Sequence, residues 1–197
     1  MNIQELIASK KLILTDVDGV LLDWENSFHD WMRTRGYIGN DVNYHYDLHV
    51  HYNMQKDEIK EHIVEYNASA WMCCLPPIRD AVEGVKTLSD MGFRFGAITS
   101  LSSDPYAAKL RDRNLRELFG DVWEFIICLD TGADKDKSLA PYKGSGLYWI
   151  EDKVENSALG ADLGLNSLLM RHSYNSTFVH EGVKSVDNWA QIVEIIS

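Results

Sequence analysis

Short apolar runs of strand length alternate with helical repeats over most of this chain. The expected strands are the run that ends before Asp16 and residues 93–98, 123–129, 147–150 and 167–170. The expected helices cover residues 78–91, 105–118, the stretch that ends at Leu163 and the stretch after Asp187. Strands that alternate with helices are typical of an α/β fold, in which crossover helices cover a parallel sheet.

Residues 23–75 interrupt this alternation. Aromatic and aliphatic side chains recur at helical spacing over 24–32 and again over 59–66, whereas the stretch YHYDLHVHY between them shows no clear period. We therefore expect a small helical insertion at 23–75, directly after the first strand, on an α/β core formed by 1–22 and 76–197.

Polar side chains follow three of the expected strands at the point where each strand ends. They are Asp16 and Asp18, Thr99 and Ser100, and Glu151 and Asp152. Open parallel sheets bind their ligands at the carboxyl ends of the strands. We therefore expect these side chains to meet at one edge of the sheet.

The pair Asp16 and Asp18 indicates metal and phosphoryl chemistry. Side chains alternate along an extended strand, so the two carboxylates project to the same side, and Gly19 allows the backbone to turn sharply after them. Carboxylates suit a hard cation such as Mg²⁺, to which Asp152 can add an oxygen. One carboxylate can then attack phosphorus, while the other protonates the leaving oxygen. A strand-end hydroxyl and a lysine would bind the phosphoryl oxygens.

Composition restricts the partners of the chain. It has 19 Lys and Arg against 30 Asp and Glu, a formal net charge of −11, which argues against binding to duplex nucleic acid or to an anionic membrane. A bound divalent cation would still allow a small phosphorylated substrate to bind. The oligomeric state is left open by the sequence.

Cysteine content and the absence of targeting patterns suggest a cytoplasmic protein. The chain has 3 cysteines, two of them adjacent, which is a poor disulfide framework and favours a reducing compartment. We recognise no signal peptide at the N-terminus and no apolar stretch of about 20 residues that would predict a membrane span.

The motifs and their order resemble those of the haloacid dehalogenase-like (HAD) superfamily. The resemblance rests on Asp-x-Asp-Gly-Val-Leu after an apolar strand, then a strand-end hydroxyl, a lysine and an acidic pair, and covers about 12–22 and 76–196. It implies a three-layer, Rossmann-like parallel sheet. It also implies that Asp16 is the nucleophile, Asp18 the general acid and base, and Thr99 the hydroxyl of the second motif.

The resemblance also implies the ligands of the site. Metal binding is assigned to Asp16, Asp18 and Asp152, and phosphate binding to Gly19, Thr99, Ser100 and a lysine. The lysine is Lys135, Lys137 or Lys143; we favour Lys137, placed to open a short helix before Pro141, with Lys143 as the next choice. In the fourth motif, either Glu151 or Asn156 is expected to assist the metal.

The inserted segment is similar to the helical cap, of the type called C1, in the 5′(3′)-deoxyribonucleotidase-like branch of this superfamily. Four aromatic side chains are candidates for stacking on a nucleobase or for packing the cap, namely Trp24, Trp31, Tyr44 and Tyr46. The first functional hypothesis is therefore a Mg²⁺-dependent phosphomonoesterase that acts on nucleoside monophosphates through an aspartyl-phosphate. The alternatives are a phosphatase or phosphomutase for a sugar phosphate or another small metabolite, and a catalytically weak module that binds a phosphorylated ligand or a protein.

Overall fold

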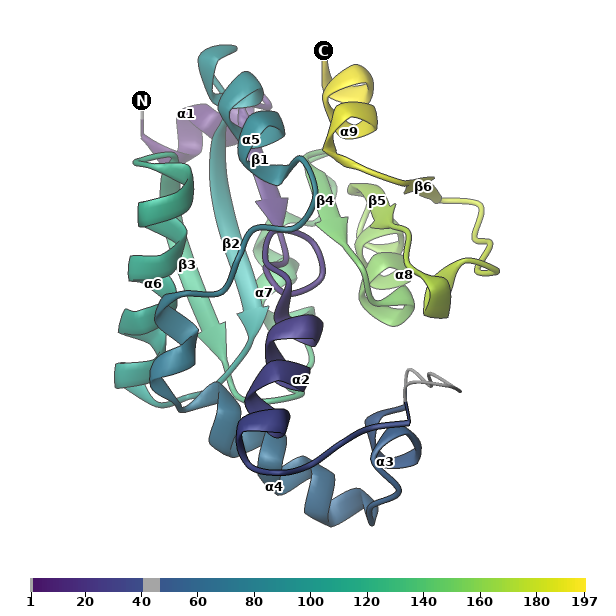
Figure 1. Cartoon of the computed structure of the whole chain (residues 1–197). Coiled ribbons are helices and arrows are strands. Elements are labelled where there is room, and N and C mark those ends of the chain that lie inside the picture. The colour runs from purple at the N-terminus through teal and green to yellow at the C-terminus, as the bar shows by residue number, and fades with distance from the viewer. Residues whose placement is uncertain (1, 41–46) are drawn as a thin grey trace.

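A computed structural model of the protein describes residues 2–40 and 47–197, and these residues form a parallel sheet of six strands (Figure 1). The strand order is β3-β2-β1-β4-β5-β6, and every neighbouring pair is parallel. The strands are β1 (Leu12–Thr15), β2 (Arg94–Ser100), β3 (Trp123–Leu129), β4 (Tyr148–Glu151), β5 (Asn166–Met170) and β6 (Val183–Val186). The expected α/β fold is confirmed, and each expected strand is present within two residues of its expected ends.

Helices cover both faces of the sheet, which gives three layers. One face packs against α5 (Ala81–Asp90), α6 (Pro105–Phe119) and α9 (Trp189–Ile196). The other packs against α1 (Ile3–Ala8), α7 (Asp136–Leu139), η2 (Ala140–Tyr142) and α8 (Val154–Asp162). A short turn of helix, η3 (Ser173–Asn175), follows β5. The helix boundaries follow local signals: α6, for example, begins at the Asp104 cap with Pro105 in its first turn and ends before Gly120, whose φ is +74°.

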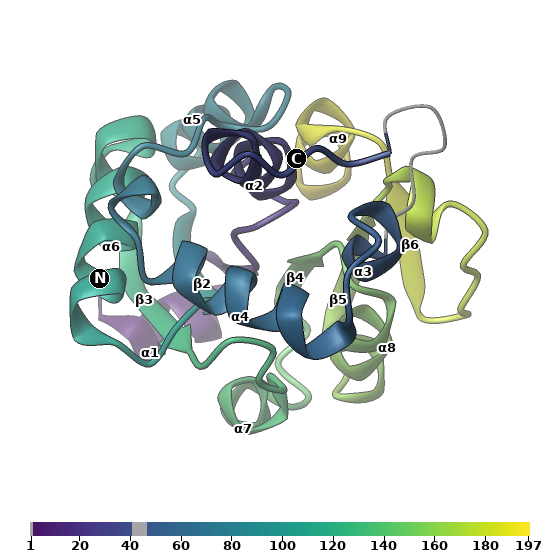
Figure 2. The ribbon, with the colours of Figure 1, turned by 60° about the horizontal axis from the view of Figure 1, so that its bottom comes forward.

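Between β1 and α5, all regular elements of the described residues are helices. They are α2 (Trp24–Thr34), α3 (Leu48–His51), α4 (Lys56–Asn67) and η1 (Ala70–Cys73). Figure 2, in which the lower end of Figure 1 comes forward, shows α2, α3 and α4 in front of the sheet, at the carboxyl ends of its strands.

The two connections to these inserted helices run side by side. Leu22 and Pro77 form an isolated antiparallel bridge. The Asp23 N–H donates to the Pro76 carbonyl at 2.9 Å, and the Ile78 N–H donates to the Leu21 carbonyl at 2.8 Å. The chain therefore leaves the core and returns to it at a single place.

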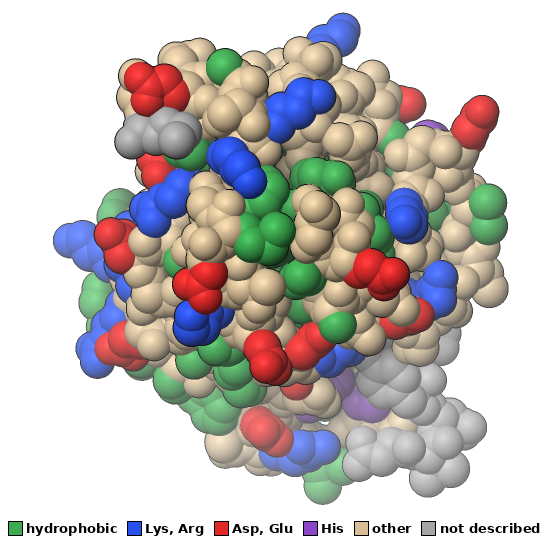
Figure 3. All heavy atoms as spheres, turned by 90° about the horizontal axis from the view of Figure 1, so that it is seen from above, with side chains coloured by type: hydrophobic (Ala, Val, Ile, Leu, Met, Phe, Trp, Pro, Cys, Tyr) green, Lys and Arg blue, Asp and Glu red, His purple; other side chains and the backbone are tan. Residues whose placement is uncertain are grey.

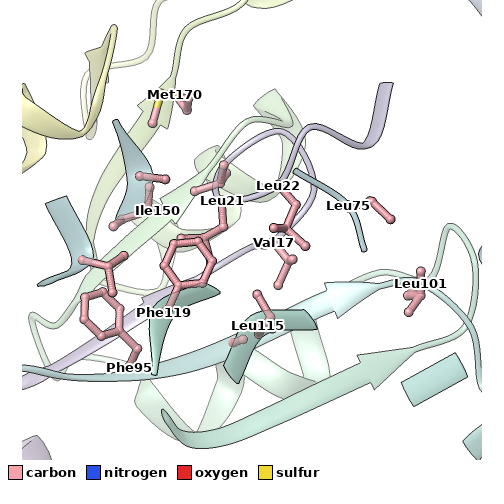
Figure 4. Packing of buried hydrophobic residues seen from close by; sticks show 14 of the residues in the cluster. Val17, Leu21, Leu22, Leu75, Phe95, Leu101, Leu115, Phe119, Ile150 and Met170 are labelled. Carbon is pink, nitrogen blue, oxygen red and sulfur yellow. The ribbon is translucent and has the colours of Figure 1, made fainter. Parts of the chain in front are cut away.

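The loop after β1 is anchored by its own apolar side chains. Val17, Leu21 and Leu22 are fully buried and pack with Leu115 of α6 and Ile150 of β4 (Figure 4). Such close packing leaves little room for side chains to shift. The loop that carries the two aspartates of the first motif is thereby held in a fixed position on the sheet.

At the end of the molecule away from the inserted helices, neither acidic nor basic side chains gather in one patch (Figure 3). Figure 3, which looks down on that end from above the view of Figure 1, shows acidic and basic side chains scattered among apolar ones. Across residues 2–40 and 47–197, none of the helices combines the length and the apolar character that crossing a membrane requires.

Candidate active site

A cavity of about 730 Å³ lies between the carboxyl ends of the strands and the inserted helices. Its lining brings together the polar side chains of the three strand ends, namely Asp16, Asp18, Thr99, Ser100, Glu151 and Asp152. The carboxyl end of a parallel sheet is where ligands of such folds bind, so this cavity is the candidate active site.

Lys135, in the turn before α7, links the first and fourth motifs. Its Nζ lies 2.7 Å from Asp16 Oδ2 and 2.9 Å from Glu151 Oε2. Lys137, which was the favoured lysine, is exposed and does not line the cavity, so the structure places Lys135 at this position instead. The second choice, Lys143, is also exposed and outside the lining. The chain folds so that only the first of the three lysines points inward.

This ion-pair cluster is buried. The side chain of Lys135 is 1% exposed, that of Glu151 is 0% exposed and that of Asp16 is 10% exposed. Burial alone would lower the pKa of Lys135, but the neighbouring carboxylates of Asp16 and Glu151 outweigh it and raise that pKa. Burial and the charge of Asp16 raise the pKa of Glu151. The lysine is therefore a permanent cation at neutral pH.

The Glu151 carboxylate, which lines the cavity, is paired within this cluster. Besides Lys135, its carboxylate accepts hydrogen bonds from the Lys153 N–H and from Asn156 Nδ2, both at 3.2 Å. Asn156 therefore orients Glu151, and Glu151 in turn holds Lys135. Neither side chain needs to bind a metal to find a partner.

Asp152 faces the loop of the first motif. Gly19, with φ of +75°, lies so close that a Cβ there would collide with the Asp152 carboxylate. The Tyr174 hydroxyl donates a hydrogen bond to Asp152 Oδ2. Burial and the charge of Asp16 raise the pKa of Asp152 to about 7. Gly19, which was expected to bind phosphate, lines the cavity, and its N–H donates to the Leu22 carbonyl at 3.0 Å. Its lack of a side chain leaves room for the Asp152 carboxylate.

The acidic groups fit a divalent cation. Oxygen atoms of Asp16, Glu151 and Asp152 all lie within 4.8 Å of one another. All three residues line the cavity, and carboxylate oxygens are the ligands that Mg²⁺ prefers.

Asp18 lies apart from this cluster. Arg111 of α6 places Nη1 at 2.5 Å from Asp18 Oδ1 and Nη2 at 3.2 Å from Oδ2. Burial raises the pKa of Asp18, while Arg111 opposes that shift. Asp18 was expected to bind the metal with Asp16 and Asp152, but in the structure its carboxylate lies outside the group formed by Asp16, Glu151 and Asp152 and faces Arg111.

The two hydroxyls of the second motif differ. Thr99 Oγ1 is buried and has no hydrogen-bond partner among residues 2–40 and 47–197, although the residue lines the cavity. A buried hydroxyl without a partner is costly, so an acceptor supplied by a ligand would stabilise it. The Ser100 hydroxyl already donates to the Ala133 carbonyl at 2.8 Å. Thr99 is therefore the better placed of the two for a phosphoryl oxygen.

The inserted segment lines the cavity with both apolar and polar side chains. Trp24 lines the cavity, stacks on Phe28 at 5.0 Å between ring centroids and donates from Nε1 to Asn67 Oδ1 at 2.8 Å. Trp31 is buried in the packing of the helices and does not line the cavity. The other two aromatic candidates, Tyr44 and Tyr46, lie outside the described residues.

Three residues of this site were not expected from the sequence, namely Arg111, His172 and Tyr174. His172 donates from Nε2 to the Gly19 carbonyl at 2.7 Å and stacks on Tyr174 at 5.1 Å between ring centroids. Both follow β5 in a stretch without regular periodicity, so nothing in the sequence pattern marks them. Arg111 occupies a position on the buried side of α6, which is a detectable signal.

Neither the family models nor the curated protein sequences compared with this chain give a match. Solved structures do match. CbbY from Rhodobacter sphaeroides, in complex with phosphate, gives a TM-score of 0.61 at 15% identity over 92% of this chain and 96% of that one. A HAD-superfamily hydrolase from Ehrlichia chaffeensis gives 0.55 at 14% identity over 94% and 95% of the two chains.

A third match is the D,D-heptose 1.7-bisphosphate phosphatase from B. bronchiseptica, complexed with magnesium and phosphate. Its TM-score is 0.58 at 14% identity, and the match covers 94% of this chain and 97% of that one. The matches span nearly the whole of each chain, so the likeness extends beyond the sheet. The chain therefore has the fold of the HAD-superfamily hydrolases.

Proposed function

We propose that this chain is a phosphomonoesterase that forms an aspartyl-phosphate on Asp16 and requires Mg²⁺. The placement of Asp16 carries the proposal. Its carboxylate lies at the carboxyl end of β1 against the Lys135 ammonium, in the same cavity as Asp18 and the partnerless Thr99 hydroxyl. A carboxylate can attack a phosphoryl group when neighbouring cations and donors offset the negative charge of that group.

The chain's residues divide the reaction between them. Asp16 forms a bond to phosphorus as the bond to the leaving oxygen breaks, and that oxygen takes a proton from Asp18. Water then attacks phosphorus and gives a proton to Asp18, and the bond between phosphorus and Asp16 breaks to release phosphate. Lys135 holds Asp16 and offsets charge, and Thr99 donates to a phosphoryl oxygen. When bound at Asp16 and Asp152, Mg²⁺ would supply Lewis-acid stabilisation of that oxygen charge.

A nucleoside monophosphate is the substrate class that we favour. The lining of the cavity includes one aromatic and four aliphatic side chains, namely Trp24, Leu48, Ile59, Ile63 and Ile78. A nucleobase buries a flat apolar surface, whereas a sugar phosphate presents hydroxyl groups that need polar partners. We also propose that the inserted helices, within 23–75, act as the cap that selects the leaving group.

A sugar phosphate is the second candidate, and the structural matches support it. The heptose bisphosphate phosphatase acts on such a compound by its name, and a mutant of CbbY was solved in complex with xylulose-(1,5)bisphosphate. A carboxylate and an amide on the wall of the cavity, Glu25 and Asn26, offer hydrogen-bonding groups that hydroxyls of a sugar require.

The test is a panel of nucleoside monophosphates, sugar phosphates and p-nitrophenyl phosphate, with Mg²⁺ or with EDTA. We expect Mg²⁺-dependent phosphate release, loss of turnover in Asp16→Asn, and a phosphorylated Asp16 peptide in acid-quenched wild-type enzyme. Asp136→Asn is the matched control, because it neutralises an exposed carboxylate that does not line the cavity. Undiminished turnover in Asp16→Asn would refute the covalent mechanism, and silence on every ester would favour a binding module.

A further inference from the structure

Arg111 is a charged side chain in the interior of α6. Its side chain is 0% exposed, and it follows Ala107 and precedes Leu115 on the buried side of the helix. Burying a guanidinium costs several kcal/mol unless it is paired and hydrogen-bonded. Among the described residues, Asp18 is the sole carboxylate within ion-pair distance of it.

The pair has the geometry of a fork. Each of two guanidinium nitrogens bonds a different oxygen of Asp18, Nη1 at 2.5 Å and Nη2 at 3.2 Å. Two parallel hydrogen bonds fix the plane of a carboxylate as well as its position. No other side chain in residues 2–40 and 47–197 forms a hydrogen bond with the Asp18 carboxylate, which is 23% exposed on the cavity side.

The same guanidinium contacts the inserted segment. Its Nη2 lies 3.4 Å from Met72 Sδ in η1, where the chain returns from the insertion to the core. One turn along α6, Asn114 donates from Nδ2 to the Leu75 carbonyl at 3.1 Å. The side of α6 that holds Asp18 is therefore also the side on which the returning chain rests.

We propose that Arg111 is a positioning residue that sets the orientation of the Asp18 carboxylate for proton transfer. The inference rests on the proposed function, in which Asp18 gives a proton to the leaving oxygen and later takes one from water. Arg111 does not touch the substrate, because it lies behind Asp18 and does not line the cavity. Through its contact with Met72, Arg111 also couples the orientation of the Asp18 carboxylate to the position of the segment that returns from the inserted helices.

Replacement of Arg111 by methionine tests the proposal. A misplacement of a reacting group by about 1 Å costs roughly 100-fold in rate, so we expect kcat to fall about 10- to 100-fold with KM little changed. The leaving group of p-nitrophenyl phosphate needs little protonation. With this substrate, transfer of the phosphoryl group to Asp16 should therefore stay fast, whereas hydrolysis of the aspartyl-phosphate should slow. A burst of about one nitrophenolate per enzyme should then precede the slow steady state.

Two further measurements separate positioning from folding. In an Asp18→Asn background, Arg111→Met should change kcat less than about twofold, because an effect transmitted through Asp18 disappears with it. Arg113→Met is the matched control, since Arg113 lies on the same helix but is exposed and paired with Glu117. Arg111→Lys, which keeps the charge and loses the fork, repeats the test if the methionine variant does not fold.

The outcomes are distinct. Wild-type protein without turnover or phosphoenzyme would refute the proposed function itself. If the wild type turns over, two results would overturn the positioning role alone. In the first, the Arg111 variants have the same kcat as Arg113→Met. In the second, Arg111→Met lowers kcat by the same factor in the Asp18→Asn background as in the wild type. A loss of kcat confined to enzymes that retain Asp18, accompanied by the burst, is the result expected if Arg111 acts through that carboxylate.

Discussion

Replacement of the buried Lys135 should lower the free energy of unfolding, because it leaves two buried carboxylates without their cation. In Lys135→Met, Asp16 and Glu151 lose the cation that lies within 2.9 Å of both carboxylates. Glu151 keeps two hydrogen bonds, from the Lys153 N–H and from Asn156, but neither partner carries a full charge. Breaking a buried ion pair by removing one partner costs about 3–5 kcal/mol. We expect a loss of that size at pH 8, out of a total stability of about 5–15 kcal/mol.

The loss should depend on pH in a defined direction. Burial already raises the folded-state pKa of Glu151, so the stability associated with its protonated form is lost as pH rises through that pKa. Lys135 lowers that pKa, so its removal moves the pKa further upward, and the loss of stability with rising pH continues to a higher pH than in wild type. The deficit of Lys135→Met relative to wild type should therefore shrink between pH 8 and pH 5.

Urea unfolding in the presence of EDTA, at pH 5, 6.5 and 8, measures this deficit. The matched control is Lys137→Met, which removes a neighbouring exposed lysine and should change stability by less than about 0.5 kcal/mol. The double variant Lys135→Met, Glu151→Gln should recover part of the loss, because one unpaired charge is removed with its partner. A deficit below about 1 kcal/mol at pH 8, or one that is equal at pH 5 and 8, would refute the reasoning.

Three further predictions concern Gly19 and Asp152. Gly19→Ala and Gly36→Ala both place alanine at a positive φ, which should lower the free energy of unfolding by about 1–2 kcal/mol each. Only the alanine at position 19 meets the Asp152 carboxylate, so only Gly19→Ala should also lose Mg²⁺ binding in calorimetry. Because the pKa of Asp152 is about 7 without metal, Mg²⁺ affinity should rise about tenfold per pH unit below pH 7 and level off above it; equal affinities at pH 6 and 8 would contradict this. The hydrogen bond from Tyr174 lowers that pKa, so Tyr174→Phe should move the midpoint of this titration to higher pH, and an unchanged midpoint would count against the contact.

The layered fold was predictable because its central strands are buried on both faces. The prediction of a strand at 123–129 is confirmed residue for residue, as β3. The strand β6 was missed, because an edge strand of four residues, VKSV, with only Val186 buried, carries neither a continuous apolar run nor a long alternation. Its place in the sheet is set by pairing with β5, which local sequence does not encode.

The site was predictable only where strand ends determine it. Asp16 and Asp152 directly follow β1 and β4, and Thr99 lies near the carboxyl end of β2, so topology alone brings them to one edge. The lysine comes from a turn, where a shift of two positions separates the inward Lys135 from the exposed Lys137, and no periodicity distinguishes them.

Arg111 is an intermediate case between these two. A charge on the apolar stripe of α6 signals a buried partner, but that partner, Asp18, lies 93 positions away in the chain. The sequence pattern marks the arginine as unusual, whereas only the folded structure identifies what it pairs with.

The paired connections at Leu22 and Pro77 make the inserted helices a replaceable part of the chain. Because the chain departs and returns across one bridge, a longer or shorter insertion would leave the register of the sheet untouched. A substitute would need to reproduce the contacts with the core, such as the packing of Met72 and Leu75 and the bond from Asn67 Nδ2 to the Leu101 carbonyl at 2.9 Å. Evolution could thus change the wall that faces the substrate while keeping the carboxylates that react with it.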